Sequence, residues 1–314
     1  MEAIQIASPP DTVTGDDIIL PFQADRAGAS GRLVRLGPAV DEILRGHAYP
    51  EAVCKLLGEA VALTALLGAS LKFEGKFIFQ TRTDGPVNML VADYRSSGDL
   101  RGFAGFDAQK FAALEKIGNM DSAKFLGAGT LAMTVDRGPD MERYQGIVAL
   151  KGGDLNQAAD AYFRQSEQLP TFIRVAVARH YSAETRDQNQ WRWRAGGLML
   201  QHLTREGGHG AQATPGDEDG WNRARLLAAT VEDSELVDPM LAPEDLLYRL
   251  FHDEQVRAFK SRPLAFHCGC SPGGVKAMLG RFGGDEIKDM VEDGRIRVTC
   301  EFCNSRYDFD PEDF

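Results

Sequence analysis

Four of the five cysteines stand in two tight pairs near the C-terminus, Cys268-x-Cys270 and Cys300-x-x-Cys303, separated by 29 residues. Two such pairs, brought together by a chain that folds back, supply the four thiolates of a tetrahedral zinc site. The surrounding segment, 263–314, has the pattern of two short helices and one hairpin, which cannot build much core without a metal or disulfides. We therefore predict one zinc ion per chain, whose binding supplies folding energy on the order of 10 kcal/mol.

Other interpretations of the cysteines stay open at this point. The two pairs could be unrelated thiols that never meet. Cys300-x-x-Cys303 alone could be a thioredoxin-like redox pair, but that chemistry needs a helix beginning at the first cysteine, and the following residues favour a turn into a strand. Cys54 lies in an apolar helical stretch and is predicted to be a buried core thiol. His267 is predicted to be a neighbour of the site, since four thiolates already complete a ligand set.

Composition narrows the classes of protein. The chain has 314 residues with 43% hydrophobic content, enough for two domains or for one domain with an appendage. A formal net charge of −11 disfavours nucleic acid as a partner, because such binding depends on clustered Lys and Arg. The longest apolar stretch, Val53–Leu71, is interrupted by Lys55 and Glu59, so no membrane span is expected. With no signal peptide pattern, a reducing cytoplasmic location is predicted, where paired cysteines are metal ligands or redox groups.

The first 203 residues predict a mixed α/β domain behind a short tail, within an overall α+β fold class. Residues 1–16 are expected to form a disordered tail. From 17 to 203, stretches typical of strands, such as IILPFQ, RLVRLG and GTLAMTVD, accompany a long helix that starts after Pro50 and a second helix that ends at Pro170. No P-loop, dinucleotide fingerprint or catalytic constellation is found here, and Trp191 and Trp193 are predicted to pack. The sequence therefore predicts no enzyme.

A change of composition after Leu203 marks a linker over 204–262. Its beginning is rich in Gly and acidic residues, and two short amphipathic helices follow. This helical pattern carries little apolar mass, so the linker should be only marginally stable alone. We expect it to dock against the zinc-binding domain, 263–314, and to loosen when that domain unfolds. The apolar side chains then exposed would be Trp221, Leu226, Leu227, Leu246, Leu247, Leu250 and Phe251.

Several longer stretches of the chain carry a family resemblance. They are LLGEAVALTALLGASLKFEG, TDGPVNML, YQGIVALKGGDLNQAADAYFRQSEQLPT, GGLMLQ and FHCGC followed by VTCEFCNSRYDF. From about residue 17 to 310 the sequence resembles the redox-regulated 33 kDa chaperonins, the 33-kilodalton heat-shock proteins of bacteria. The cysteine arrangement and the stretch 166–170 are the most specific parts. A longer N-terminal tail and a Gly- and acid-rich insert around 207–220 depart from the family pattern and blur the linker boundaries.

The resemblance implies a holdase chaperone of the oxidative stress response. Such a protein is inactive when reduced and zinc-bound, and oxidation under unfolding conditions releases the zinc and activates it. By motif match the zinc ligands would be Cys268, Cys270, Cys300 and Cys303, and the implied disulfides are Cys268–Cys270 and Cys300–Cys303. The implied partners are unfolded or partly unfolded client proteins, and the oxidised form is expected to be a homodimer.

The residues by themselves also allow three rival functions. A zinc-ribbon nucleic-acid-binding protein is the first, although residues 301–314 carry one Arg and five acids. A thiol oxidoreductase is the second. The third is a zinc-stapled structural protein that oxidation would merely inactivate.

Overall fold

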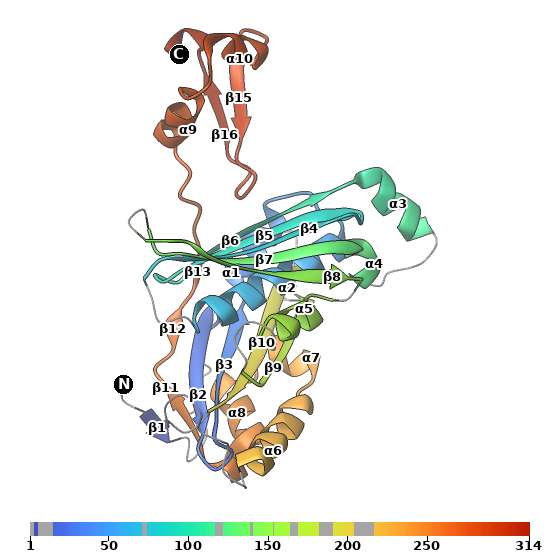
Figure 1. Ribbon diagram of the computed structural model, residues 1–314, viewed down its shortest axis with the longest axis vertical. Helices are drawn as coiled ribbons and strands as arrows, with labels where there is room; N and C mark the ends of the chain where they lie inside the picture. Colours follow the sequence, from blue (N-terminus) through green and yellow to red (C-terminus); the bar gives the residue numbers. More distant parts are fainter. Residues whose placement is uncertain are drawn as a thin grey trace.

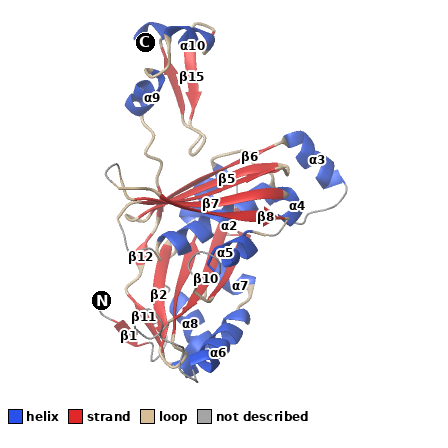
Figure 2. Ribbon diagram, viewed as in Figure 1, coloured by secondary structure: helices blue, strands red, loops and turns tan. Residues whose placement is uncertain are grey.

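The computed structural model describes residues 3–5, 15–70, 74–116, 122–138, 141–152, 154–163, 169–181, 191–203 and 217–314. Two large β-sheets enclose a long helix, further helices cover the outer side of one sheet, and a small module stands apart at the C-terminal end (Figure 1). Coloured by secondary structure, the same view separates these layers (Figure 2). The predicted α+β class is therefore confirmed.

The first sheet, sheet A, has seven strands that pair in antiparallel fashion. Its order is β1-β11-β2-β3-β10-β9, and β12 also pairs with β2. Alternate residues of its central strands are buried on opposite faces, which is why the sheet can carry apolar layers on both sides. The strands are β1 (Ala3–Gln5), β2 (Ile18–Ala24), β3 (Ala29–Leu36), β9 (Thr171–Tyr181), β10 (Trp191–His202), β11 (Val256–Phe259) and β12 (Arg262–Pro263).

The second sheet, sheet B, has the order β13-β6-β5-β4-β7-β8. β4, β5 and β6 form a meander, with the turn Asp84-Gly85-Pro86 between β4 and β5, and the hairpin of β7 and β8 pairs with the other edge of β4. Only β13 runs parallel to its neighbour. The strands are β4 (Lys76–Thr83), β5 (Val87–Arg95), β6 (Asp99–Phe106), β7 (Ala128–Asp136), β8 (Tyr144–Lys151) and β13 (Ala265–Phe266).

Helix α2 (Glu51–Gly68) lies between the two sheets and holds them together (Figure 1). Fourteen of its 18 residues are buried, as expected for a helix that is apolar nearly all round. Cys54 is among them, and burial raises the pKa of its thiol to about 11, so the predicted inert core thiol is confirmed. The shorter helices α1 (Pro38–Arg45) and α5 (Leu155–Tyr162) contact α2, and α3 (Ala108–Lys116) and α4 (Ser122–Leu126) lie in the connection between β6 and β7.

The N-terminal tail differs from the expected disordered segment at the residues that the structure describes. Ala3–Gln5 form β1 and pair with β11, because the end of sheet A offers unpaired backbone groups to any nearby extended chain. Asp16 lies beside the buried Arg194 and accepts hydrogen bonds from its guanidinium, one of them at 2.6 Å. The rest of the predicted tail, residues 1–2 and 6–14, lies outside the described residues.

The linker helices α6 (Asp217–Ala229), α7 (Asp233–Val237) and α8 (Pro243–Phe251) pack on the face of sheet A opposite α2 (Figure 1). This differs from the expected docking against the zinc-binding domain, and β11 and β12, within the predicted linker 204–262, are strands of sheet A. The physical reason is apolar area, because that face of sheet A offers a large core that includes Leu20, Phe22, Leu33, Leu198 and Leu200.

Of the linker side chains predicted to dock, most are buried or partly buried in this core. Leu246, Leu247, Leu250 and Phe251 are buried. Leu226 is the exception, since 62% of it is exposed on the outer side of α6. The predicted flexible start of the linker, 204–216, lies outside the described residues.

Two buried arginines of sheet A bind the end of α7. Arg35 donates hydrogen bonds to the carbonyls of Glu235 (3.2 Å), Asp238 and Leu241. Arg194 donates to the carbonyl of the last residue of α7 at 2.7 Å. The carbonyls of Glu235, Val237 and Asp238 are among those that a helix end leaves without intrahelical partners, and Leu241 lies in the connection to α8. Each guanidinium thus satisfies acceptors that docking would otherwise bury alone. Burial, and then the charge of Arg194, lower the pKa of Arg35 to about 10.

Replacing Gly196 by Ala is expected to undock α7. A Cβ at Gly196 would lie 2.0 Å from the Leu236 carbonyl oxygen, a backbone atom that cannot turn aside. We expect a loss of about 2 kcal/mol or more in urea unfolding. Gly273→Ala, where nothing lies within 4 Å of the added atom, is the matched control. Equal unfolding midpoints for both variants would contradict this account.

Glu59→Gln is expected to stabilise the protein at neutral pH and above. Burial, followed by the charges of Asp154 and Asp233, raises the pKa of the Glu59 carboxyl from 4.5 to about 7. The native state therefore binds more protons than the unfolded state between these values, and stability falls as pH rises from about 4.5 to about 7. Since the side chain keeps partial exposure, we expect a gain of about 1–2 kcal/mol at pH 8. Urea unfolding of the wild type and the variant at pH 4 and pH 8 measures the difference in unfolding free energy. The same difference at both pH values would contradict the raised pKa of Glu59.

Candidate metal centre

The C-terminal module matches the predicted two helices and one hairpin. Its elements are α9 (Pro272–Leu279), α10 (Gly284–Asp289), β14 (Val291–Glu292), β15 (Arg295–Thr299), β16 (Arg306–Phe309) and the 3₁₀ helix Pro311–Asp313. Its fully buried apolar core among the described residues consists of four side chains, Leu279, Ile287, Ile296 and Phe309. Burial of so few side chains does not offset the conformational entropy that the module loses on folding, so another source of stability is needed.

The first cysteine pair lies in the loop between β13 and α9. Ser271 follows directly as the N-cap of α9, and its side chain accepts a hydrogen bond from the Gly274 N–H at 3.1 Å. This fixed helix start holds Cys268 and Cys270 at the base of the module.

The second pair lies in the turn that joins β15 to β16. The Cys300 N–H donates to the Ser305 carbonyl at 2.9 Å, and the Asn304 N–H donates to the Cys300 carbonyl at 2.8 Å. Asn304 has φ 56°, in the left-handed region that closes tight turns. No helix begins at Cys300, so the turn lacks the helix N-terminus on which a thioredoxin-like pair depends.

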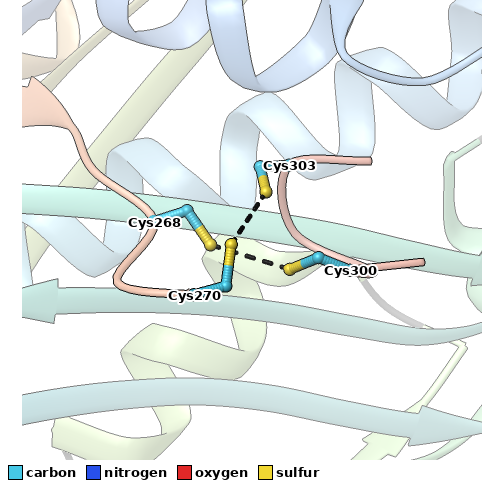
Figure 3. A group of neighbouring side chains, drawn as sticks. All are labelled: Cys268, Cys270, Cys300 and Cys303. Atoms are coloured by element: carbon cyan, nitrogen blue, oxygen red, sulfur yellow. Dashed lines mark hydrogen bonds between the residues drawn. The ribbon is translucent and has the colours of Figure 1, made fainter. Parts of the chain in front are cut away.

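The two pairs meet, with the four sulfur atoms within 4.8 Å of one another. Figure 3 shows all four side chains pointing into the same small space, two from each loop. Cys268 Sγ lies 3.7 Å from Cys300 Sγ, and Cys270 Sγ lies 3.3 Å from Cys303 Sγ. Both contacts join one pair to the other, as expected when ligands converge on one centre. These four sulfurs could hold a single metal ion.

The surroundings favour thiolate on one side of the cluster and thiol on the other. Burial raises the pKa of Cys268 to about 12. The pKa of Cys303 is lowered to about 6: burial opposes this, but hydrogen bonding from Ser305, whose hydroxyl lies 3.2 Å away, outweighs it. Tyr307 donates its hydroxyl proton to Cys270 Sγ at 3.0 Å. A bound dication would reverse the cost of ionising all four thiols.

His267 stands outside this cluster, as predicted. Its backbone N–H donates to the Leu100 carbonyl at 2.9 Å, which extends the contact between β13 and β6. Among the described residues, no other group of His, Cys, Asp or Glu has metal-ligand spacing. Trp193 is buried, and Trp191 makes an edge-on contact with the ring of Tyr181. The predicted packing role of the two tryptophans is therefore confirmed.

Phe302, inside the second cysteine pair, ties the module to sheet B. Its ring meets Phe103 of β6 edge-on at 5.1 Å between centroids, and the Arg101 guanidinium lies 3.9 Å above its centre. The Phe302 carbonyl also lies 3.4 Å from His47 Nε2. Phe302 was not predicted as a functional residue from the sequence. The signal that could have indicated it is a large apolar side chain inside a polar turn.

Three comparisons place these features among known proteins. The family model described as Hsp33 protein matches residues 17–310. Proteins named 33 kDa chaperonin from Caulobacter vibrioides and Nitrosococcus oceani are 43% and 37% identical to the chain, which they cover over 96% and 93%, with 97% and 91% of their own lengths matched.

A crystal structure of the Thermotoga maritima 33 kDa chaperonin is similar in fold. It superposes with a TM-score of 0.74 over 95% of this chain and 96% of its own, at 21% sequence identity. Within the described part of the chain, no helix has the length and apolar character to cross a membrane.

Cys303→Ser is expected to reduce metal binding and to unfold the module while sheets A and B persist. Replacing one of four thiolates removes a ligand that a hydroxyl replaces poorly. Elemental analysis of the reduced protein should give about one ion per chain for the wild type and well below that for the variant. Cys54→Ser, remote from the cluster, is the control. A variant with unchanged metal content would exclude the four-sulfur centre.

Proposed function

The chain belongs to the Hsp33 family of chaperonins, and from this membership we propose that it is a redox-regulated holdase. In the proposal, the reduced metal-bound form is inactive, and oxidation of the four cysteines activates binding of unfolding proteins. A chaperone role follows from the family; the redox mechanism is the part proposed. The observation that carries it is the convergence of Cys268, Cys270, Cys300 and Cys303 at the base of a module with a four-residue core.

We propose zinc as the ion. A tetrahedral site with Zn–S distances of about 2.3 Å requires sulfur atoms about 3.8 Å apart. The closest sulfur distances of 3.3 and 3.7 Å, in an all-thiol site, fit such a shell. Bound zinc would supply charge compensation and cross-linking to the module, and no open position for substrate chemistry. The protein is accordingly proposed not to be an enzyme.

Activation begins with the loss of thiolates. Each disulfide forms when two thiols give up two electrons and two protons to one peroxide molecule, which becomes two waters. The proposed bonds are Cys268–Cys270 and Cys300–Cys303, on the family likeness. Disulfide sulfur is a poor zinc ligand, so the ion leaves and its contribution to folding, about 10 kcal/mol or more, leaves with it.

The chain path couples the module to the linker. β11 and β12 lie in sheet A, β13 lies on sheet B, and Cys268 follows β13 after one residue. Unfolding of the module would therefore release the C-terminal end of the linker, the segment that contains α6, α7 and α8. Undocking those helices would expose the apolar face of sheet A that they cover, and exposed apolar surface is what binds unfolded proteins.

The proposed setting and partners follow from the same chemistry. A cytoplasmic location keeps the thiols reduced until oxidative stress. The partners are unfolded or partly unfolded client proteins, and the oxidised form is proposed to be a homodimer. Nucleic acid and membranes are proposed not to be partners, because the net charge of −11 opposes binding to phosphate groups.

The first test follows light scattering of a heat-denatured client with the reduced protein and after peroxide treatment at elevated temperature. A chelating dye in the same tube reads zinc release. We expect suppression of aggregation only after oxidation, with about one zinc freed per chain. Mass spectrometry of proteolytic peptides should then show disulfides within each cysteine pair.

Other outcomes point to the rival functions. Zinc release while the client still aggregates would leave the cysteines as a structural staple. Tight, salt-dependent binding of RNA or DNA by the reduced protein would favour a zinc-ribbon module. Turnover of a disulfide substrate by the zinc-free protein would favour an oxidoreductase.

A further inference from the structure

Sheet B presents its outer face, the face turned away from α2, without a covering helix in the described part of the chain (Figure 1). Strand pairing places one row of residues across this face, from Ile147 on β8 through Ala132, Gln80 and Val91 to Phe103 on β6. Directly paired residues share a face, so these side chains form a continuous row, called here the Ile147–Phe103 row. At strand spacing it spans about 19 Å, the length of about six extended residues.

The residues next to the row along each strand face the opposite way, toward α2, which confirms that the row lies on the outer face. Val148, Leu131, Thr81 and Leu90 alternate with row residues along their strands and are buried toward α2. The row itself is exposed at one end and covered at the other. Ile147 is 61% exposed, whereas Phe103 is only 9% exposed and carries the Phe302 ring on it. The covered end is thus closed by a residue of the metal-bound module.

An aromatic side chain already binds at one end of this apolar surface. Phe302 adds an edge-on ring contact to Phe103 and a cation–π contact to Arg101, both typical of apolar recognition with a cationic neighbour. It stands between two metal-ligating cysteines, so the metal fixes the turn that presents it. Loss of that turn would remove Phe302 and leave Phe103 exposed at the end of the row.

The charge around the row is unlike that of the whole chain. By strand alternation, the outer face of sheet B carries five cations and three carboxylates among the described residues, although the net charge of the chain is −11. They are Lys76, Arg82, Arg95, Arg101 and Lys151, against Asp93, Asp99 and Asp136. Asp93 forms ion pairs with Lys76 at 2.8 Å and with Arg101 at 2.7 Å, so two of the five cations are matched by a carboxylate of the same face. Arg82 and Lys151 are exposed on the side of the face toward Ala149. A ligand of matching charge has an apolar centre and acidic ends.

We propose that the Ile147–Phe103 row binds an extended apolar client segment with acidic flanks, and that Phe302 occupies one end of this site in the metal-bound form. The inference rests on the proposed holdase function and names one surface that clients contact. This surface is separate from the face of sheet A beneath the linker helices, which becomes accessible only when those helices undock. The Ile147–Phe103 row becomes fully accessible when the Phe302 turn leaves it, which happens as soon as the module unfolds.

The test uses the oxidised full-length protein and a fluorescein-labelled peptide with an apolar centre and aspartates at both ends. Fluorescence anisotropy gives the Kd. Ile147→Asp is expected to weaken binding about tenfold, since it removes an apolar contact and adds a charge that repels the peptide ends. Leu226→Asp, equally exposed at 62% but on α6, is the matched control and should change the Kd less than about twofold.

Two further comparisons sharpen the result. A peptide of the same centre with lysines at both ends should bind more weakly to the wild type than the acidic peptide does. The reduced metal-bound wild type should bind the acidic peptide more weakly than the oxidised protein, and Phe302→Ala in the reduced state should recover part of that difference.

The outcomes separate this site from the proposed function. If oxidised wild type suppresses aggregation and Ile147→Asp matches it in both Kd and suppression, the row is not a client site. If Ile147→Asp instead converts an oxidised dimer to monomer in sedimentation, with the peptide Kd unchanged, the face joins two copies of the chain and the proposal is overturned. If peptide binding depends on Ile147 but oxidation never activates aggregation suppression, the row stands and the holdase mechanism fails.

Discussion

The convergence of four sulfurs within 4.8 Å is the constraint on which the C-terminal module depends. Four buried side chains cannot order a module of about fifty residues, because each residue fixed costs roughly 1–2 kcal/mol of conformational entropy. A metal bound by thiolates could, and the four sulfurs lie at the point where the module meets sheet B. In the proposed metal-bound form, the metal–sulfur bonds that keep the module folded would also keep Phe302 on Phe103 and the end of the linker in place.

The rest of the molecule has the opposite energetic character. α2 is buried between two sheets, and a second apolar core lies beneath the linker helices. These layers depend on buried area rather than on a bond that an oxidant can break. A chain built in this way can lose one part without losing the other. In the proposed mechanism, oxidation would unfold the module, while the sheets that would present apolar surface to clients persist. Separate sources of stability are what make a switch compatible with a lasting scaffold.

Local sequence signals predicted most elements and singled out the four cysteines that the fold brings together. The long helix after Pro50, the hairpin at Asp84-Gly85-Pro86 and the Ser271 cap each follow from a rule that acts within a few residues. The four cysteines are readable because few residue types bind metal at such spacing. Where elements dock is not local: β11 enters sheet A across more than two hundred residues, and the linker covers sheet A because that face has the larger apolar area.

The contact of Phe302 with sheet B shows why such docking cannot be predicted from local sequence patterns, although the proposed function depends on it. Nothing near the second cysteine pair predicts Phe103 or Arg101, two hundred residues earlier, as its neighbours. Only the folded chain brings this turn onto the row that ends in the exposed Ile147. The two proposed consequences of oxidation then differ in cost: releasing the ring contact and the cation–π contact of Phe302 costs about 1–3 kcal/mol, whereas undocking three helices requires exposing a whole core. The row on sheet B should therefore open before the face of sheet A, and clients would meet it first.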